Sequence, residues 1–204
     1  MSGQFQSQPS FYLASSSPRR KELLIQLGYQ FGIVVPDIEE QQQSNETAPD
    51  YVARLSCQKA QAGVAMLAKQ TPSFSLPVLG SDTIVVVDDH VLEKPNDFSH
   101  FCHMMALLSG RKHQVMTAVT VANAIHSQTR TVVTDVWFKA LTEHEIISYW
   151  NTGEPCDKAG GYGIQGIGGR FVSRIEGSFH AVMGLPLLES DELLSLPEFG
   201  ISSF

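Results

Sequence analysis

The segment at residues 78–89 constrains the fold most, because it is rich in Val and Ile along its whole length. A continuous β-branched run of this kind predicts a strand that is buried on both faces, as in α/β proteins whose sheets are covered by helices. Three polar residues in succession, Ser81, Asp82 and Thr83, interrupt the run. A buried Asp82 needs a cation, a metal or a position at the mouth of a cleft; the alternative is a hydrogen-bonded turn at the strand end.

The flanking segments alternate between strand and helix patterns. An apolar run at residues 11–14 is followed by Ser17 and Pro18, a good N-cap and a good first helical residue, and Gly28 ends this helix. Further strands are predicted at residues 29–35, 114–123, 129–139 and 171–175, and further helices at residues 47–69, 97–108, 142–153 and 186–196. The alternation, with one long hairpin, predicts an α/β fold with a mixed sheet.

The chain is expected to form one domain at residues 11–197, with a disordered tail at residues 1–10 and a short tail at residues 198–204.

Lys and Arg total 14 against 21 Asp and Glu, a net charge of −7, which argues against a nucleic-acid partner. No apolar run approaches the roughly 20 residues that span a bilayer, and the polar N-terminus does not resemble a secretory signal. Three widely spaced cysteines indicate a reducing compartment, so we expect a cytoplasmic protein.

Two arginines, Arg19 and Arg20, fall in the first turn of the first predicted helix. A helix N-terminus carries partial positive charge, so each exposed cation there is unfavourable by about 0.3–1 kcal/mol. An anion reverses this effect, because the helix end and both guanidinium groups then hold it. The preceding serine turn, which includes Ser15, favours an anion site over the alternative of two solvated arginines.

Lys59 interrupts the apolar face of the second predicted helix. At about 100° per residue, Val52, Leu55, Ala62 and Met66 form one stripe, and Lys59 falls in its middle. Either its ammonium group reaches out to solvent, or the inner face holds something negative.

Further charged residues, Glu40, Lys94 and Asp157, lie near the ends of predicted elements. Cations and carboxylates in this mixture suit a magnesium-bound polyphosphate, because the cations neutralise oxygens while the carboxylates hold the metal and activate water. The sequence has no G-x-S-x-G motif for acyl transfer and no Walker A motif; the glycine-rich loop at residues 160–169 lacks its Lys-Ser/Thr ending.

The chain resembles the Maf family of nucleotide pyrophosphatases over nearly its whole length. Several separate motifs in the same order carry the resemblance: LASSSPRR at residues 13–20, GSDTIV at 80–85, LEKP at 92–95, LSG at 108–110, DKAGGYGIQG at 157–166 and GLPL at 184–187. The resemblance implies hydrolysis of a nucleoside triphosphate between its α and β phosphates, with a divalent cation such as Mg²⁺ or Mn²⁺. It also implies an inosine-triphosphatase-like fold, with a mixed sheet in two lobes around a central cleft, and a homodimer.

The resemblance also assigns the site residues. The general base of the family matches Asp82. The positions assigned to the metal are Glu40, Asp82 and Asp157. The positions assigned to the substrate are Ser15, Arg19, Arg20, Lys59, Thr83, Lys94 and Gln165.

Three of these positions, Arg19, Thr83 and Gln165, distinguish the branches of the family. The residues here are similar to the branch that prefers dTTP and UTP, with modified pyrimidine nucleotides as further candidates, whereas the branch acting on 7-methyl-GTP has Trp, Gln and Glu. The Gln165 amide can both donate and accept, which matches the adjacent carbonyl and N–H of a pyrimidine. The alternative is a regulator of cell division or septum formation that binds a nucleotide without turnover.

Overall fold

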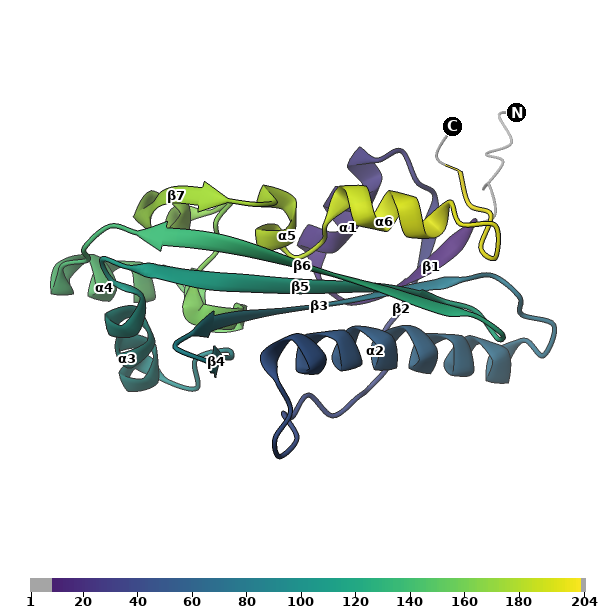
Figure 1. Cartoon of the computed structure of the whole chain (residues 1–204), viewed down its shortest axis with the longest axis horizontal. Coiled ribbons are helices and arrows are strands. Elements are labelled where there is room, and N and C mark those ends of the chain that lie inside the picture. The colour runs from purple at the N-terminus through teal and green to yellow at the C-terminus, as the bar shows by residue number, and fades with distance from the viewer. Residues whose placement is uncertain (1–8, 203–204) are drawn as a thin grey trace, which may run out of the picture.

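A computed structural model describes residues 9–202 as a mixed sheet with helices on both faces (Figure 1). The strands are β1 (Phe11–Ala14), β2 (Phe31–Val34), β3 (Val78–Val87), β4 (His90–Leu92), β5 (Lys112–Ala122), β6 (Ser127–Phe138) and β7 (Val172–Glu176). The α-helices are α1 (Pro18–Gln26), α2 (Ala48–Gln70), α3 (Phe98–Leu108), α4 (Glu143–Trp150), α5 (Phe179–Met183) and α6 (Leu187–Leu194). Three short 3₁₀ helices are η1 (Glu154–Asp157), η2 (Ala159–Gly161) and η3 (Ile167–Phe171).

The sheet order is β2-β1-β3-β5-β6-β7, and β4 pairs with one end of β3. β1 is parallel to both β2 and β3, and the other pairs are antiparallel. The predicted α/β class, the mixed sheet and the long β5–β6 hairpin are therefore confirmed.

One edge of β3 is open along its middle. β1 pairs with β3 at Val78 and Leu79, and β4 pairs with it from Val85 to Val87. Between these two pairings, residues 80–84 of β3 have β5 on one side and no described strand on the other. A gap in the sheet thus opens at the polar residues that the sequence places inside this strand.

The two faces of β3 pack against different layers, as predicted for a strand buried on both sides. Ile84 and Val86 pack with α2 on one face, whereas Leu79 packs with α1 and α6 on the other. Val85 belongs to a cluster with α3 and α4 at the far end of the molecule. Because side chains alternate along a strand, Asp82 faces α2, and its two polar neighbours face the opposite side.

Although three polar residues interrupt the Val- and Ile-rich run, β3 continues unbroken through Ser81, Asp82 and Thr83. Asp82 is opposite Ala118 of β5, in the middle of a regular ladder. The polar residues do not break the strand because β5 satisfies one edge of its backbone, while the cleft and the facing helices receive their side chains. The alternative of a turn at the strand end is excluded.

The buried face of α2 also differs from the predicted stripe. Met66 is 40% exposed and Ala62 is partly exposed, so both lie off the buried face. Val52 and Leu55 are buried as predicted, and the helix also buries Tyr51, Ser56, Ala60, Gly63 and Leu67. This face includes small residues because the helix lies close to the sheet; a Cβ on Gly63 would lie 2.8 Å from a methyl group of Val78.

The predicted starts of three helices at residues 47, 97 and 142 are confirmed: Thr47, Asp97 and Thr142 are the N-caps, and their side chains each accept a hydrogen bond from an N–H three residues on. Thr142 and Glu145 form a complete capping box. Ser17 occupies the N-cap position of α1, but its side chain makes no capping hydrogen bond. The predictions missed β4 and α5, which are short.

Parts of both predicted tails lie in residues 1–8 and 203–204, outside the described residues. The backbone N–H and the hydroxyl of Ser10 both donate to the Gln30 carbonyl. Near the other end, Phe199 is 7% exposed in the cluster with α1 and α6. Within residues 9–202, no helix combines the length and apolar character that a membrane span requires.

Candidate active site

All ten predicted site residues line one cleft of about 460 Å³. They are Ser15, Arg19, Arg20, Glu40, Lys59, Asp82, Thr83, Lys94, Asp157 and Gln165. They come from six separate stretches of the chain, which the fold brings together at the open edge of β3.

The parallel strands explain why the first of these stretches meet. The serine turn and α1 follow the carboxyl end of β1, and the loop with Glu40 follows the carboxyl end of the neighbouring β2. The carboxyl ends of parallel strands open onto the same crevice, which is where α/β sheets bind ligands. β3 is parallel to β1 and continues past it, so Asp82 lies beside this crevice.

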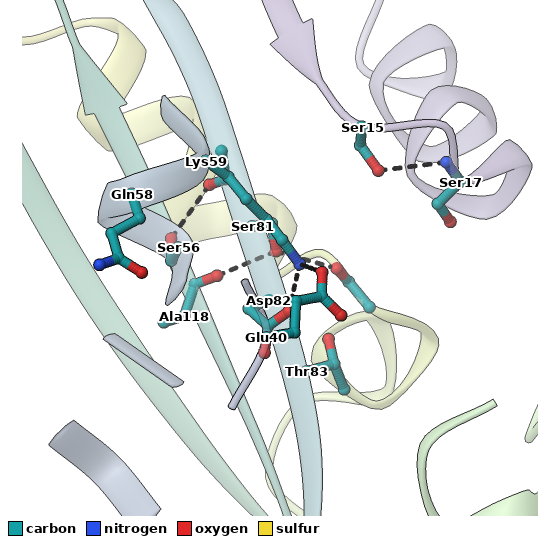
Figure 2. A network of polar contacts seen from close by, with 12 residues as sticks. Ser15, Ser17, Glu40, Ser56, Gln58, Lys59, Ser81, Asp82, Thr83 and Ala118 are labelled. Atoms are coloured by element: carbon teal, nitrogen blue, oxygen red, sulfur yellow. Dashed lines mark hydrogen bonds and ion pairs between the residues drawn. The ribbon is translucent and has the colours of Figure 1, made fainter. Parts of the chain in front are cut away.

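Lys59 bridges two carboxylates in the cleft (Figure 2). Its Nζ lies 2.5 Å from Asp82 Oδ1 and 2.6 Å from Glu40 Oε1. The Lys59 side chain is 12% exposed, which excludes the alternative that its ammonium reaches out to solvent. The contact forms because α2 covers the face of β3 to which Asp82 points.

These contacts shift the two carboxylates in opposite directions. Burial raises the pKa of Asp82 above its usual value, although the charges of Lys59 and Arg20 oppose the shift. Burial also acts to raise the pKa of Glu40, but the hydrogen bond and charge of Lys59 outweigh it, and the net shift is downward. Asp82 is therefore the more basic of the two. No described residue donates a hydrogen bond to its second oxygen, Oδ2.

Arg20 is held in the cleft by neutral oxygen atoms. Its Nε donates to the Gly184 carbonyl at 2.9 Å, and its terminal nitrogens lie 3.3 Å from Ser15 Oγ and 3.4 Å from Thr83 Oγ1. Among residues 9–202 no carboxylate lies within 4.0 Å of this guanidinium, and burial lowers its pKa. A cation that is partly desolvated without an ion-pair partner can bind an anion.

Gly184, at the end of α5, accounts for part of this geometry. Its φ of 117° lies in the region that L-residues avoid, and its carbonyl accepts from both Arg20 and Ser81. The GLPL motif therefore supports the arginine from the opposite side of the cleft. The GLPL motif is visible in the sequence, but nothing in the sequence indicates that the Gly184 carbonyl accepts hydrogen bonds from Arg20 and Ser81.

Arg19 faces a different group of charges. Its Nη1 lies 3.7 Å from Asp157 Oδ2, and Lys158 Nζ lies 2.6 Å from the other oxygen of that carboxylate. Burial acts to raise the pKa of Asp157, but Lys158 and Arg19 together lower it. Lys158, with 13% of its side chain exposed, is a cleft residue that the sequence reasoning missed, although it lies inside the DKAGGYGIQG motif.

Two predicted residues make looser contacts. Lys94 Nζ lies 4.0 Å from Glu40 Oε2 and its side chain is 63% exposed. Gln165 is exposed at the rim, on the glycine-rich loop between η2 and η3. Both side chains can therefore turn toward a ligand.

Glu93 is a further cleft residue that was not predicted. It lines the cleft and accepts a hydrogen bond from Tyr51 Oη at 2.9 Å.

The donor set fits a hard divalent cation only in part. Glu40 and Asp82 already face one cation, the Lys59 ammonium, and oxygen donors of this kind suit Mg²⁺. Asp157 pairs elsewhere, and residues 9–202 contain no group of three acidic, His or Cys side chains placed to hold a metal. Two carboxylates agree with the usual Mg²⁺ mode, in which the phosphates of the substrate complete the shell.

The fold and the cleft together define an α/β protein in which cations from separate elements converge beside the buried Asp82, as an anion-binding site requires. The chain belongs to the Maf-like protein family, whose model matches residues 10–196.

Curated relatives match over nearly the whole chain. A protein of Aliivibrio fischeri (strain ATCC 700601 / ES114) is 63% identical over 90% of this chain and 95% of its own length. A protein of Vibrio parahaemolyticus is 62% identical over 91% and 95%, and one of Escherichia coli O6:K15:H31 is 58% identical over 91% and 92%. All three are named dTTP/UTP pyrophosphatase. Among solved structures, the Staphylococcus aureus Ham1 protein matches with a TM-score of 0.46 and 12% identity, a likeness too distant to carry an argument.

Proposed function

We propose that this protein is a nucleoside triphosphate pyrophosphatase that hydrolyses dTTP and UTP to the monophosphate and pyrophosphate. The observation that carries the proposal is the cleft itself, where the cations of an otherwise acidic chain converge around the buried Asp82. The names of the relatives, at about 60% identity over nine-tenths of the chain, support the same reaction.

In this proposal Arg19, Arg20, Lys59 and Lys94 hold the triphosphate, and Ser15 supports Arg20 through its hydroxyl. Asp82 accepts a proton from a water molecule as the water oxygen forms a bond to the α-phosphorus. The bond from the α-phosphorus to the bridging oxygen breaks, and pyrophosphate leaves. The surrounding cations stabilise the charge that develops on the leaving group.

The raised pKa of Asp82 supports its role as the base, because a base works best when its pKa is closer to the working pH. Glu40 and Asp82, with Asp157 nearby, would hold Mg²⁺ or Mn²⁺. When bound, the metal would neutralise phosphate oxygens and polarise the reacting phosphoryl group.

Base recognition falls to the rim of the cleft. Gln165 presents an amide that matches the carbonyl and N–H of uracil or thymine. Arg19 contributes there as well as to the triphosphate. Modified pyrimidine nucleotides share this edge and are further candidate substrates.

The remaining properties in this proposal are a homodimeric state, a cytoplasmic location, and no nucleic-acid or membrane partner. The homodimer rests on the family resemblance, and light scattering coupled to gel filtration tests it. All three cysteines of the chain are free, which suits a reducing compartment. The net charge of −7 opposes binding to nucleic acid.

Pyrophosphate release from a panel of triphosphates tests the function. The panel contains dTTP, UTP, CTP, GTP, ATP and 7-methyl-GTP, each with Mg²⁺. The proposal expects turnover of dTTP and UTP well above the others. Binding of dTTP without pyrophosphate release would favour the alternative, a nucleotide-binding regulator, and strong activity on 7-methyl-GTP alone would contradict the substrate assignment.

A further inference from the structure

The carboxylate of Glu154 lies beneath the loop that carries Gln165. Glu154 begins η1, and its Oε2 accepts from the Ile167 N–H at 2.8 Å. Its Oε1 accepts from the Gly168 N–H at 3.0 Å and from Tyr149 Oη at 2.8 Å. One side chain therefore receives two backbone donors from the far end of the loop.

Tyr149 extends this anchor to the near end of the loop. Its oxygen donates to Glu154 and accepts from the Gly163 N–H at 3.1 Å. Tyr149 is 2% exposed, and burial raises the pKa of its hydroxyl, which therefore stays protonated as a donor. Through this relay, both ends of the segment from Gly163 to Gly168 are tied to the Glu154 carboxylate, and Gln165 lies between them.

The glycines of the loop leave room for this carboxylate. A Cβ on Gly166 would lie 2.5 Å from both Glu154 oxygens, and one on Gly168 would lie 2.6 Å from Tyr149 Oη. A side chain at either position would displace the Glu154 carboxylate or the Tyr149 hydroxyl from its present place. Glycine at positions 166 and 168 thus allows the loop backbone to lie close to the Glu154 carboxylate.

The charge on Glu154 is balanced by backbone dipoles. Burial acts to raise its pKa, but the N–H groups of Gly168 and Ile167, with the Tyr149 hydroxyl, lower it overall. No ion pair joins its carboxylate to a cation among residues 9–202, since Lys158 Nζ bonds the Glu154 carbonyl oxygen instead. The ionised carboxylate of Glu154 therefore accepts its hydrogen bonds from the loop backbone and from Tyr149.

We infer that Glu154 is a positioning residue that, through Tyr149, fixes the loop in the conformation in which Gln165 recognises the pyrimidine. This inference rests on the proposed function for the identity of the base. Removing the anchor releases the loop, so recognition of the base weakens, whereas Arg20 and Lys59 keep their partners, which lie outside the loop.

The test compares Glu154→Gln, Tyr149→Phe and the control Glu143→Gln with the wild type. The carboxamide in Glu154→Gln places an NH₂ group against one of the N–H donors, whereas Glu143 is exposed and has no contact with the loop. Hydrogen exchange of residues 163–168 without nucleotide should be faster in Glu154→Gln than in the wild type and the control. Tyr149→Phe should speed exchange at Gly163. Unchanged exchange in Glu154→Gln would overturn the inference whatever the enzyme's activity.

The second measurement is the ratio of kcat/KM for UTP to kcat/KM for CTP, with Gln165→Ala and the double variant Glu154→Gln/Gln165→Ala included. Glu154→Gln should lower the ratio about tenfold, mainly through a higher KM for UTP, because the hydrogen bonds lost involve a charged acceptor. When Gln165→Ala is already present, adding Glu154→Gln should change the UTP-to-CTP ratio of kcat/KM by less than about twofold. An equal loss on both substrates, or the same fold-change in both backgrounds, would reduce Glu154 to a structural residue and contradict the inference.

The two proposals fail in different ways. If the wild type releases no pyrophosphate from UTP or dTTP, the proposed function fails, and the exchange measurement still decides whether Glu154 anchors the loop. If the wild type is active and the ratio behaves additively, only the positioning role fails.

Discussion

The Lys59 ammonium lies 2.5 Å from Asp82 Oδ1, so the buried carboxylate in the middle of β3 is paired with a cation from the facing helix. The same ammonium lies 2.6 Å from Glu40, which comes from a different loop. Removing one partner of a buried charge pair leaves the other without compensation, which is costly. Lys59 therefore controls both the position and the protonation of the proposed base.

Lys59→Met should raise the pH at which activity appears. Burial already raises the pKa of Asp82, and Lys59 opposes that shift, so its removal moves the pKa higher still. A base must be deprotonated, so the acid limb of the pH profile of kcat/KM should move to higher pH than in the wild type. The pH dependence of pyrophosphate release measures this. An acid limb at the wild-type position would show that Lys59 does not tune the base.

Arg20→Lys should raise the KM for dTTP by about 10- to 100-fold, because an ammonium cannot reproduce the donors that a guanidinium presents in one plane. Arg20 bonds to Gly184, Ser15 and Thr83 at once, so a lysine would lose most of these contacts. Steady-state kinetics with Arg130→Lys as the control, an exposed arginine on β6, test this. An unchanged KM in Arg20→Lys would remove this residue from the triphosphate site.

Glu46→Gln should destabilise the protein at neutral pH, by an amount that shrinks in acid. Arg54 Nε lies 2.6 Å from Glu46 Oε1, and this hydrogen bond lowers the pKa of the carboxyl from 4.5 to about 2. A lowered pKa in the folded state stabilises above pH 4.5, and the stabilisation is lost as the pH falls toward 2. Since the pair lies near the surface, we expect a loss of about 1 kcal/mol at pH 7.

Urea unfolding of wild type and Glu46→Gln at steps from pH 7 to pH 3 checks this prediction. The difference in unfolding free energy should narrow below pH 4.5, the usual pKa of the carboxyl. A difference that is constant over this range would show that the ion pair is not its source.

Removal of divalent cations should abolish pyrophosphate release, and Mg²⁺ or Mn²⁺ should restore it. The expectation follows from the two carboxylates, Glu40 and Asp82, that face one cation position. Treatment with EDTA followed by titration of each metal measures it. Full activity in excess EDTA would contradict the metal assignment.

Local patterns in the sequence predicted the class of fold, whereas the full set of site residues came from the family resemblance. Helix caps at Thr47, Asp97 and Thr142 have short-range signals, and the two buried faces of β3 follow from its Val and Ile content. Local patterns also singled out Arg19, Arg20, Lys59 and Asp82, because each is unfavourable in its predicted element without a partner.

The partners themselves depend on pairing between distant segments and could not be predicted. That Asp82 faces Lys59 depends on the register of β3 against β5 and on which face α2 covers. The predicted stripe of α2 was wrong at Ala62 and Met66, which are apolar like buried residues, because the close approach of the helix to the sheet selects Ala60 and Gly63. Lys158 was missed because a lysine beside an aspartate has no unusual local pattern.

The most direct test of the account is pyrophosphate release from dTTP by Asp82→Asn, compared with Glu39→Gln. The asparagine keeps the shape of the side chain and removes the base, whereas Glu39 is exposed and lies outside the cleft. Asp82→Asn should lower kcat by about 10²–10⁴-fold, the usual contribution of a general base, while Glu39→Gln keeps the wild-type rate. Hydrolysis of dTTP by Asp82→Asn at the wild-type rate would contradict the assignment of Asp82 and, with it, the proposed mechanism.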